Sequence, residues 1–312
     1  MPHPRTAALS LLLVTSLLSA CSLSRLAADQ AGGIAASSAG YMRGFWDYEI
    51  ARHGTASAIM QLEAMHSISP QNEALALALV ATYVGHAFGW VELDMERARV
   101  ERRFEKATRL RQRAELIYRR ARDLALATMR ARDAGIDDAL TGDPQGMRDY
   151  LARHYPDRED LAPVFWTASS WGSMFAQTDA LDATVDLPLI RVMVEHVIAR
   201  DPGYESATGL VFLGGLYAQT PPDFGGDLTK AKAYFERALQ LTGRKSHVVQ
   251  LNYAKLYALT TNDQALFEAL MSEILEPKDH GNDVRLSNKI ARMHAELLSQ
   301  TQSHAPITLP MR

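Results

Sequence analysis

The sequence predicts an all-α fold. Apolar residues recur at helical spacing along most of the chain, and no segment alternates apolar and polar residues between hairpin turns. With 47% hydrophobic residues, 22% charged residues and a net charge of -3, the composition is that of an ordinary globular domain. The periodic segments are separated by breaks at Pro70, Gly135, Gly142–Pro144, Pro156, Pro188, Pro202, Pro221–Pro222, Gly243 and Pro277.

The first segment, residues 1–20, is predicted to be a secretory signal. A basic residue, Arg5, precedes the apolar run Ala7–Leu18, which is shorter than the about 20 residues that cross a bilayer. The following Leu18-Ser19-Ala20-Cys21 resembles the bacterial lipobox, which implies a diacylglyceryl thioether on Cys21 and a third acyl chain on its amino group. The alternative is an ordinary cleaved signal beside a chance cysteine.

Lipidation of Cys21 limits the chemistry and the location that are expected for the protein. Cys21 is the only cysteine, so the mature chain has no thiol for a disulfide, a metal or a nucleophile. Ser22, rather than aspartate, follows Cys21, which favours the periplasmic face of the outer membrane over the inner membrane.

Residues 21–40 are small and weakly patterned and are predicted to be a flexible tether. Residues 299–312 are predicted to be a frayed tail. The folded domain is therefore expected over residues 41–298.

Two helix pairs match the tetratricopeptide pattern, in which small residues let aromatic residues of the partner helix pack closely. The pairs are Leu213, Gly214 and Tyr217 with Ala231, Phe235 and Ala238, and Leu79 and Tyr83 with Ala114, Tyr118 and Ala121. Asp227 is expected to cap the second helix of the former pair after a turn at Gly225-Gly226. Degenerate units stand at Ile190, Val194 and Val197 and at Tyr253, Ala254, Tyr257, Phe267, Met271 and Ile274.

These units predict a tetratricopeptide-like helical-repeat array, or α-solenoid, with long inserted connections. A helical bundle with chance spacings is the alternative. The order of further motifs resembles one family, the T component of tripartite ATP-independent periplasmic (TRAP) transporters, over about residues 41 to 276. The motifs are Tyr118–Leu124, Phe165–Gly172, Ala199–Tyr204, Phe212–Gly215, Ala231–Ala238 and Asn252–Ala254.

The resemblance implies a helical-repeat lipoprotein that binds the substrate-binding (P) component of a TRAP system. It also implies a homo-oligomer and a cavity for apolar or organic-acid ligands, and it brings no catalytic residue. The alternative function is a generic tetratricopeptide scaffold for envelope assembly or secretion, since a solenoid binds peptides as readily as proteins. Gene neighbourhood would separate the two.

Residues 97–132 are strongly basic, and within them Arg102, Arg103 and Arg109 are candidates for docking the partner. A basic helix could indicate nucleic acid in a cytosolic protein, but export removes that partner. A solvated helix face, an acidic protein surface and anionic lipid remain as alternatives.

Aromatic residues are the candidates for the lining of an apolar cavity, because they give a large contact area at little entropic cost. They are Trp90, Phe165, Trp166 and Trp171. Trp166 and Trp171 are five residues apart on one predicted helix, so one is expected in the core and the other at a groove. The alternative is that all of them belong to the repeat core.

No motif indicates an enzyme, a metal site or a cofactor. The ten histidines lack zinc-site spacing, and His86 and His196 lie in apolar helical surroundings that indicate packing or capping. Ser169–Ser173 lacks the nucleophile elbow, and Gly225-Gly226 lacks the residues of a phosphate-binding loop. We therefore expect a non-enzymatic protein without metal or cofactor, although a hydrolase using helix-borne acids is not eliminated by motif alone.

Overall fold

The computed structural model describes residues 26–30, 32–34, 41–141, 143–178, 186–276 and 278–304. All regular elements in these ranges are helical, which confirms the predicted all-α class. The predicted signal segment and the lipidation site Cys21 lie outside the described residues.

The first half of the fold is a layer of long helices: α2 (Tyr48–Ile68), α3 (Glu73–His86), η1 (Ala87–Glu92), α4 (Leu93–Val100) and α5 (Phe104–Arg132). Asp47 caps the start of α2, and Asn72 caps the start of α3. The carboxylate of Asp47 and the amide oxygen of Asn72 each accept a hydrogen bond from a backbone N–H group. The continuous helix Glu73–Val100 is long and apolar enough to cross a membrane, but 56% of its apolar stretch is buried in the fold. Its hydrophobicity is used largely for internal packing.

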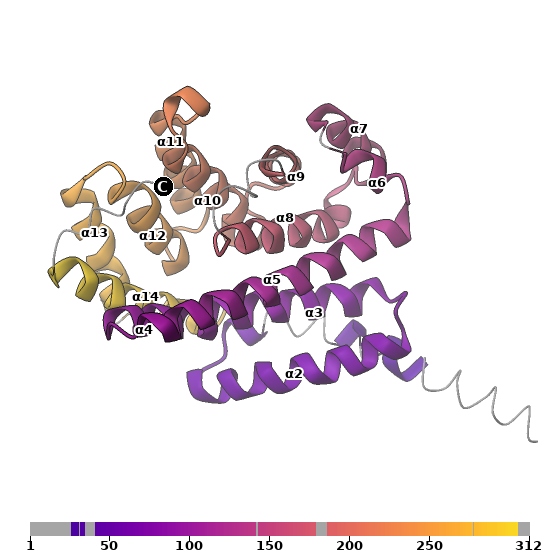
Figure 1. Cartoon of the computed structure of the whole chain (residues 1–312), viewed down its shortest axis with the longest axis horizontal. Helices are drawn as coiled ribbons and strands as arrows, with labels where there is room; N and C mark the ends of the chain where they lie inside the picture. Colours follow the sequence, from indigo (N-terminus) through magenta and orange to yellow (C-terminus); the bar gives the residue numbers. More distant parts are fainter. Residues whose placement is uncertain are drawn as a thin grey trace, which may run out of the picture.

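The second half consists of shorter helices, and it packs on the first half at both ends. These elements are α6 (Ile136–Ala139), α7 (Pro144–His154), η2 (Arg158–Asp160), α8 (Leu161–Phe175), α9 (Leu187–Arg200), α10 (Tyr204–Gln219), η3 (Pro222–Phe224), α11 (Leu228–Leu241), α12 (His247–Tyr253), η4 (Ala254–Ala258), α13 (Gln264–Leu275) and α14 (Arg285–His304). Figure 1 shows α5 crossing the molecule between α3 and α8. The last helix, α14, returns to pack on α4 and α2, so the array closes on itself.

The helix pair α10 and α11 forms as the sequence predicts. A Cβ at Gly214 would lie only 2.8 Å from the ring of Phe235, so glycine is what admits this ring between the helices. Phe235 also stacks on Tyr253 with 4.8 Å between ring centroids. Asp227 caps α11 by accepting from two backbone N–H groups at 3.0 Å, and Gly225 takes φ +94° in the preceding turn.

The structure adds detail to three segments described from the sequence. Residues 26–30 and 32–34 are helical rather than a featureless tether, and Ala28 is buried. Asp29 anchors this segment, because its carboxylate accepts from Ser69 Oγ at 2.5 Å and from Asn72 Nδ2 at 3.0 Å. At the other end, α14 continues through 299–304 instead of fraying at Ser299. Finally, the basic segment 97–132 spans two helices, because the chain turns between α4 and α5, where Arg102 takes φ +57°.

Candidate ligand cavity

Closure of the helical array leaves a cavity of about 1870 Å³ between the two halves. Its walls come from α2, α3, η1 and α4 on one side and from α8, α10, α12, η4 and α14 on the other. Most of the lining side chains are apolar. The volume exceeds the 300–1,000 Å³ that is usual for small-molecule sites, so the space can hold an extended apolar molecule.

The predicted aromatic lining falls into two groups. Trp90, Phe165 and Trp166 lie on the cavity wall, whereas Trp171 does not. Trp171 is buried in the core beside Phe175, with the guanidinium of Arg122 5.8 Å from its ring centroid. Five residues turn an α-helix by about 140° beyond a full turn, which separates Trp166 from Trp171 as the sequence analysis anticipated. Contact of the wall aromatics with a ligand remains a prediction.

Two π-helical segments border the cavity, η1 and η4. Such segments are rare and occur often at functional sites, because the extra residue redirects side chains and frees a carbonyl. The first ends at Glu92 and the second contains Lys255, and both residues line the cavity. The same local distortion therefore presents a charged side chain from each half of the fold.

A cluster of charged groups joins these segments to α4 and α14. Glu96 accepts from Lys255 Nζ at 2.9 Å and lies 2.6 Å from Nδ1 of His294. Burial favours the neutral acid, but the charges and hydrogen bonds of Lys255 and His294 prevail and lower the pKa of Glu96 to about 2. Burial opposes the charge of Lys255 as well, yet its pKa is raised by Glu96.

His294 is placed to carry both ring protons. Its Nε2 lies 3.1 Å from the carbonyl oxygen of Phe88, which can only accept, so Nε2 is the donor there. Its Nδ1 faces the ionised Glu96 and must donate too. The imidazole is 3% exposed and stacks on the Phe88 ring at 4.9 Å. Each ring nitrogen of His294 therefore faces an oxygen atom, and the ring is held in one orientation beside the cavity.

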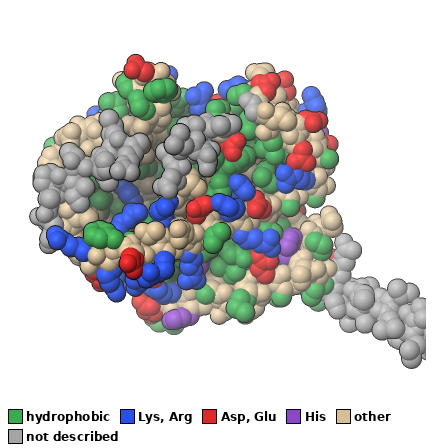
Figure 2. All heavy atoms as spheres, viewed as in Figure 1, with side chains coloured by type: hydrophobic (Ala, Val, Ile, Leu, Met, Phe, Trp, Pro, Cys, Tyr) green, Lys and Arg blue, Asp and Glu red, His purple; other side chains and the backbone are tan. Residues whose placement is uncertain are grey.

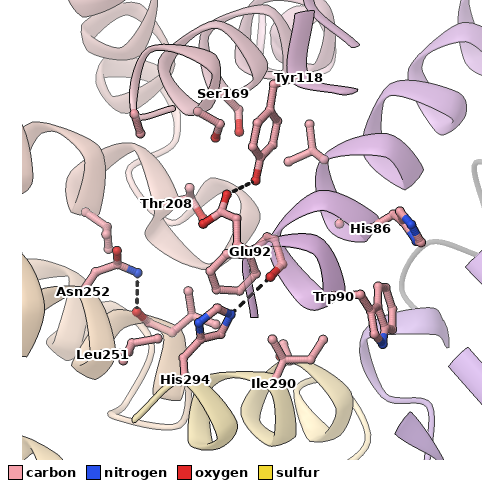
Figure 3. Close-up of a pocket in the computed structure, with 18 of the residues that line it drawn as sticks. His86, Trp90, Glu92, Tyr118, Ser169, Thr208, Leu251, Asn252, Ile290 and His294 are labelled. Carbon is pink, nitrogen blue, oxygen red and sulfur yellow. Dashed lines mark hydrogen bonds between the residues drawn. The ribbon is translucent and has the colours of Figure 1, made fainter. Parts of the chain in front are cut away.

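A second acid, Glu92, accepts from the hydroxyl of Tyr118 at 2.5 Å (Figure 3). Burial raises the pKa of Glu92 despite this hydrogen bond. Burial and the neighbouring Glu92 raise the pKa of Tyr118 well above its ordinary value. Tyr118 belongs to the predicted repeat pattern, so one residue serves both helix packing and the cavity wall.

Aromatic and basic residues of the segment before α2 also contribute to the cavity. Phe45 lines the cavity and lies between the rings of Tyr41 and Trp46, each 68% exposed. Arg43 pairs with Glu205 of α10 at 2.8 Å and so links the N-terminal segment to the second half.

The candidate docking residues lie at the turn from α4 to α5 and in the first turns of α5. Arg102 is exposed and lines the cavity, Arg103 pairs with Glu101, and Arg109 lies 3.8 Å from Glu105. Figure 2 shows Lys and Arg side chains gathered over the part of this face where α4 and the start of α5 lie in Figure 1. Basic residues further along α5, including Arg120 and Arg132, also form ion pairs.

The histidines singled out in the sequence have structural partners. His86 is buried and lies 3.1 Å from Thr55 Oγ1, and its pKa is lowered by burial and by nearby arginines. His196 lies 2.8 Å from the carbonyl oxygen of Tyr155. In the described ranges no three His, Cys, Asp or Glu side chains are grouped as metal ligands would be.

Sequence reasoning did not identify the charged cluster. Glu96 is 159 residues from Lys255 and 198 from His294, so no spacing in the sequence could connect them. The available signals were weak: a lysine within the apolar helix of a degenerate repeat, and a histidine in the last helix.

Comparison with known proteins gives the family. A model of the TRAP transporter T-component family matches residues 46–304. The chain belongs to the TRAP transporter T-component family. This is a family of transporter components and not of enzymes, and it associates the chain with a TRAP transport system. The chain is also 25% identical to an uncharacterized protein of Treponema pallidum (strain Nichols) over 294 residues, covering 88% of this chain and 90% of that protein.

Proposed function

We propose that this T component is a non-enzymatic periplasmic adaptor that binds the P component of its TRAP system and exchanges ligands with it through the central cavity. The observation that carries the proposal is the cavity of about 1870 Å³, most of whose lining comes from helices of the matched family region. A scaffold that only presents an outer surface has no need of so large an apolar cavity between its two halves. Small apolar molecules or organic acids fit its lining of apolar side chains with a few charged groups.

The architecture that we propose is a tetratricopeptide-like array with inserted connections. Its support is the packing of α3 on α5 and of α10 on α11, in which the small residues Ala121 and Gly214 lie against the partner helix. Repeat arrays offer extended surfaces for protein partners, and they also form oligomers. A homo-oligomer is part of the proposal.

The proposed site of action is the periplasmic face of the outer membrane, through acyl chains on Cys21. The support is the signal-like start of the sequence, the lipobox resemblance and Ser22. Several acyl chains give stable attachment, since each buried methylene contributes ~0.8 kcal/mol. The protein would then meet a soluble P component from a fixed position.

We expect charge reversal at the α4–α5 turn to weaken binding of the P component. The variant replaces Arg102, Arg103 and Arg109 with glutamate, and the dissociation constant should rise about tenfold because rim charges steer and orient charged partners. Biolayer interferometry with the detergent-solubilised lipoprotein and the purified P component measures this.

The matched control reverses three exposed basic residues elsewhere, Arg153 on α7 and Lys232 and Arg237 on α11. It makes the same change in net charge and should bind normally. Raising the salt concentration should weaken wild-type binding more than binding of the variant. Equal affinities for both triple variants, or affinity independent of salt, would exclude docking at this turn.

Filling of the cavity should shift the tryptophan emission to shorter wavelength, because an apolar guest removes water from the wall indoles. With octanol as probe, Trp166→Phe should lose a large part of the change, and Trp171→Phe should keep it, since Trp166 lines the cavity and Trp171 does not. A change that survives in Trp166→Phe but disappears in Trp171→Phe would place the guest elsewhere.

A further inference from the structure

The cavity carries more positive than negative charge, although the chain as a whole has a net charge of -3. Two groups of charged residues line it. The cations are Arg43, Arg99, Arg102, Lys255 and His294, and the carboxylates are Glu92, Glu96 and Glu205. A net positive charge in a mostly apolar cavity is costly without a counter-charge. The lining therefore favours an anionic guest over a neutral or cationic one.

Lys255 is the cation best placed for such a guest. Its ammonium group has three N–H donors, and Glu96 is its sole hydrogen-bond partner in the part of the chain that the structure describes. Although Lys255 lies among cavity-lining residues, 45% of its side-chain surface is open. The group is thus fixed by Glu96 on one side and retains donors for a second acceptor.

The surroundings of Glu96 fix its position and leave it little capacity to accept more. One carboxylate oxygen faces Lys255 and the other faces His294, and the side chain is only 16% exposed. Glu96 thereby orients Lys255 at a defined place on the wall, and Lys255 and His294 together oppose the repulsion that Glu96 alone would exert on an incoming anion.

Arg99 adds a second cation at the same place. It lies three residues after Glu96 on α4, lines the cavity, and is close enough that its charge lowers the pKa of Lys255 against the stronger effect of Glu96. No ion pair of Arg99 occurs among the residues described. An anion bound near both groups would relieve their mutual repulsion.

Apolar surface begins directly beside these charges. Leu251 and Ile290 lie next to His294 in Figure 3, and both line the cavity. A ligand that places a charged group on Lys255 must therefore place its remaining atoms against hydrocarbon. This combination matches an amphiphile with an anionic end and not a compact polar anion.

We infer that Lys255 and Arg99 form a carboxylate subsite, which holds the head of a single-chain carboxylic acid while its hydrocarbon chain occupies the apolar part of the cavity. This inference deepens the ligand-carrying role proposed above and rests on it. Binding involves charge-assisted hydrogen bonds and no covalent step.

The test compares three guests with one chain length and different heads: octanoate, octanol and octylammonium. The protein is the full chain with Cys21→Ser, so that no acyl chain competes, and isothermal titration calorimetry gives the affinities. Octanoate should bind about tenfold tighter than octanol, because hydrogen bonds to charged groups are worth more than neutral ones, and octylammonium should bind weakest. Lys255→Met should abolish the advantage of octanoate and leave octanol binding within about twofold.

Lys289→Met on α14 is the matched control, since Lys289 is exposed and outside the cavity lining, and it should behave as wild type. Equal binding of octanoate and octanol by the wild type, or preference for octylammonium, would overturn the inference even if Lys255→Met fails to fold. Binding of the P component by the same proteins separates the two proposals. A failed carboxylate preference with intact P-component binding removes only the subsite, whereas absent P-component binding removes the adaptor role.

Discussion

Replacing Phe235 with alanine should lower the free energy of unfolding by about 3–5 kcal/mol, the range for truncating a buried phenylalanine. The ring is completely buried between α10 and α11. It fills the space that Gly214 leaves, stacks on Tyr253 and makes an edge contact with Tyr257 at 6.4 Å. The helices cannot close over the resulting void without moving α12 as well.

Urea unfolding followed by circular dichroism at 222 nm measures this loss. The matched control is Phe224→Ala in η3, because Phe224 is 82% exposed and its truncation should change stability by at most about 0.5 kcal/mol. Similar losses in both variants would contradict the close packing of α10 on α11 described here.

The second large effect is expected at the charged cluster. Glu96→Gln should destabilise the protein by about 3–5 kcal/mol at neutral pH, because it leaves Lys255 and His294 without their shared counter-ion beside an apolar cavity. The control is Glu105→Gln on α5, whose carboxylate is 95% exposed and lies 3.8 Å from Arg109. Exposed pairs of this kind contribute little, so the control should be nearly neutral.

The loss at Glu96 should depend on pH in a defined direction. Its pKa in the folded protein is about 2, below the ordinary value of 4.5, so ionisation of Glu96 favours the folded state. This contribution, about 3 kcal/mol, is fully present above the unfolded pKa and is lost as the pH falls from about 4.5 towards 2. The stability difference between wild type and Glu96→Gln should therefore shrink over that range.

Urea titrations at pH 7, 4.5, 3 and 2.5 would follow this difference. The comparison of wild type with variant removes the contributions of the other carboxylates, which both proteins share. A difference that stays constant from neutral to acid pH would contradict the ion pairs of Glu96 with Lys255 and His294.

Much of the helical framework could be predicted from local sequence. Gly214 and Phe235 belong to a tetratricopeptide pattern that predicted a close helix pair, and Asp227 predicted the start of its second helix. Both signals can be read from neighbouring residues or from a repeated pattern. The family resemblance was likewise predictable, and the match over residues 46–304 confirms it.

The limits of some helices and the contacts of particular side chains were less predictable. Nothing in the small residues near Asp29 indicates that its carboxylate binds Ser69 and Asn72, so the segment was predicted to lack structure. Trp166 and Trp171 could be separated by helical geometry, but the sequence could not say which of them faces the cavity. Which of the two tryptophans faces the cavity depends on how α3, α5 and α9 pack against α8.

The sequence alone determined the helical class, the repeat spacing and the T-component resemblance, because these depend on residues close together in the chain or on their order. Only the tertiary structure decided that α14 returns to α4, and this contact brings with it the central cavity and the contacts of Glu96 with Lys255 and His294. Charges from such distant segments interact only after the chain has closed, since Coulomb attraction depends on distance in space and on exclusion of water.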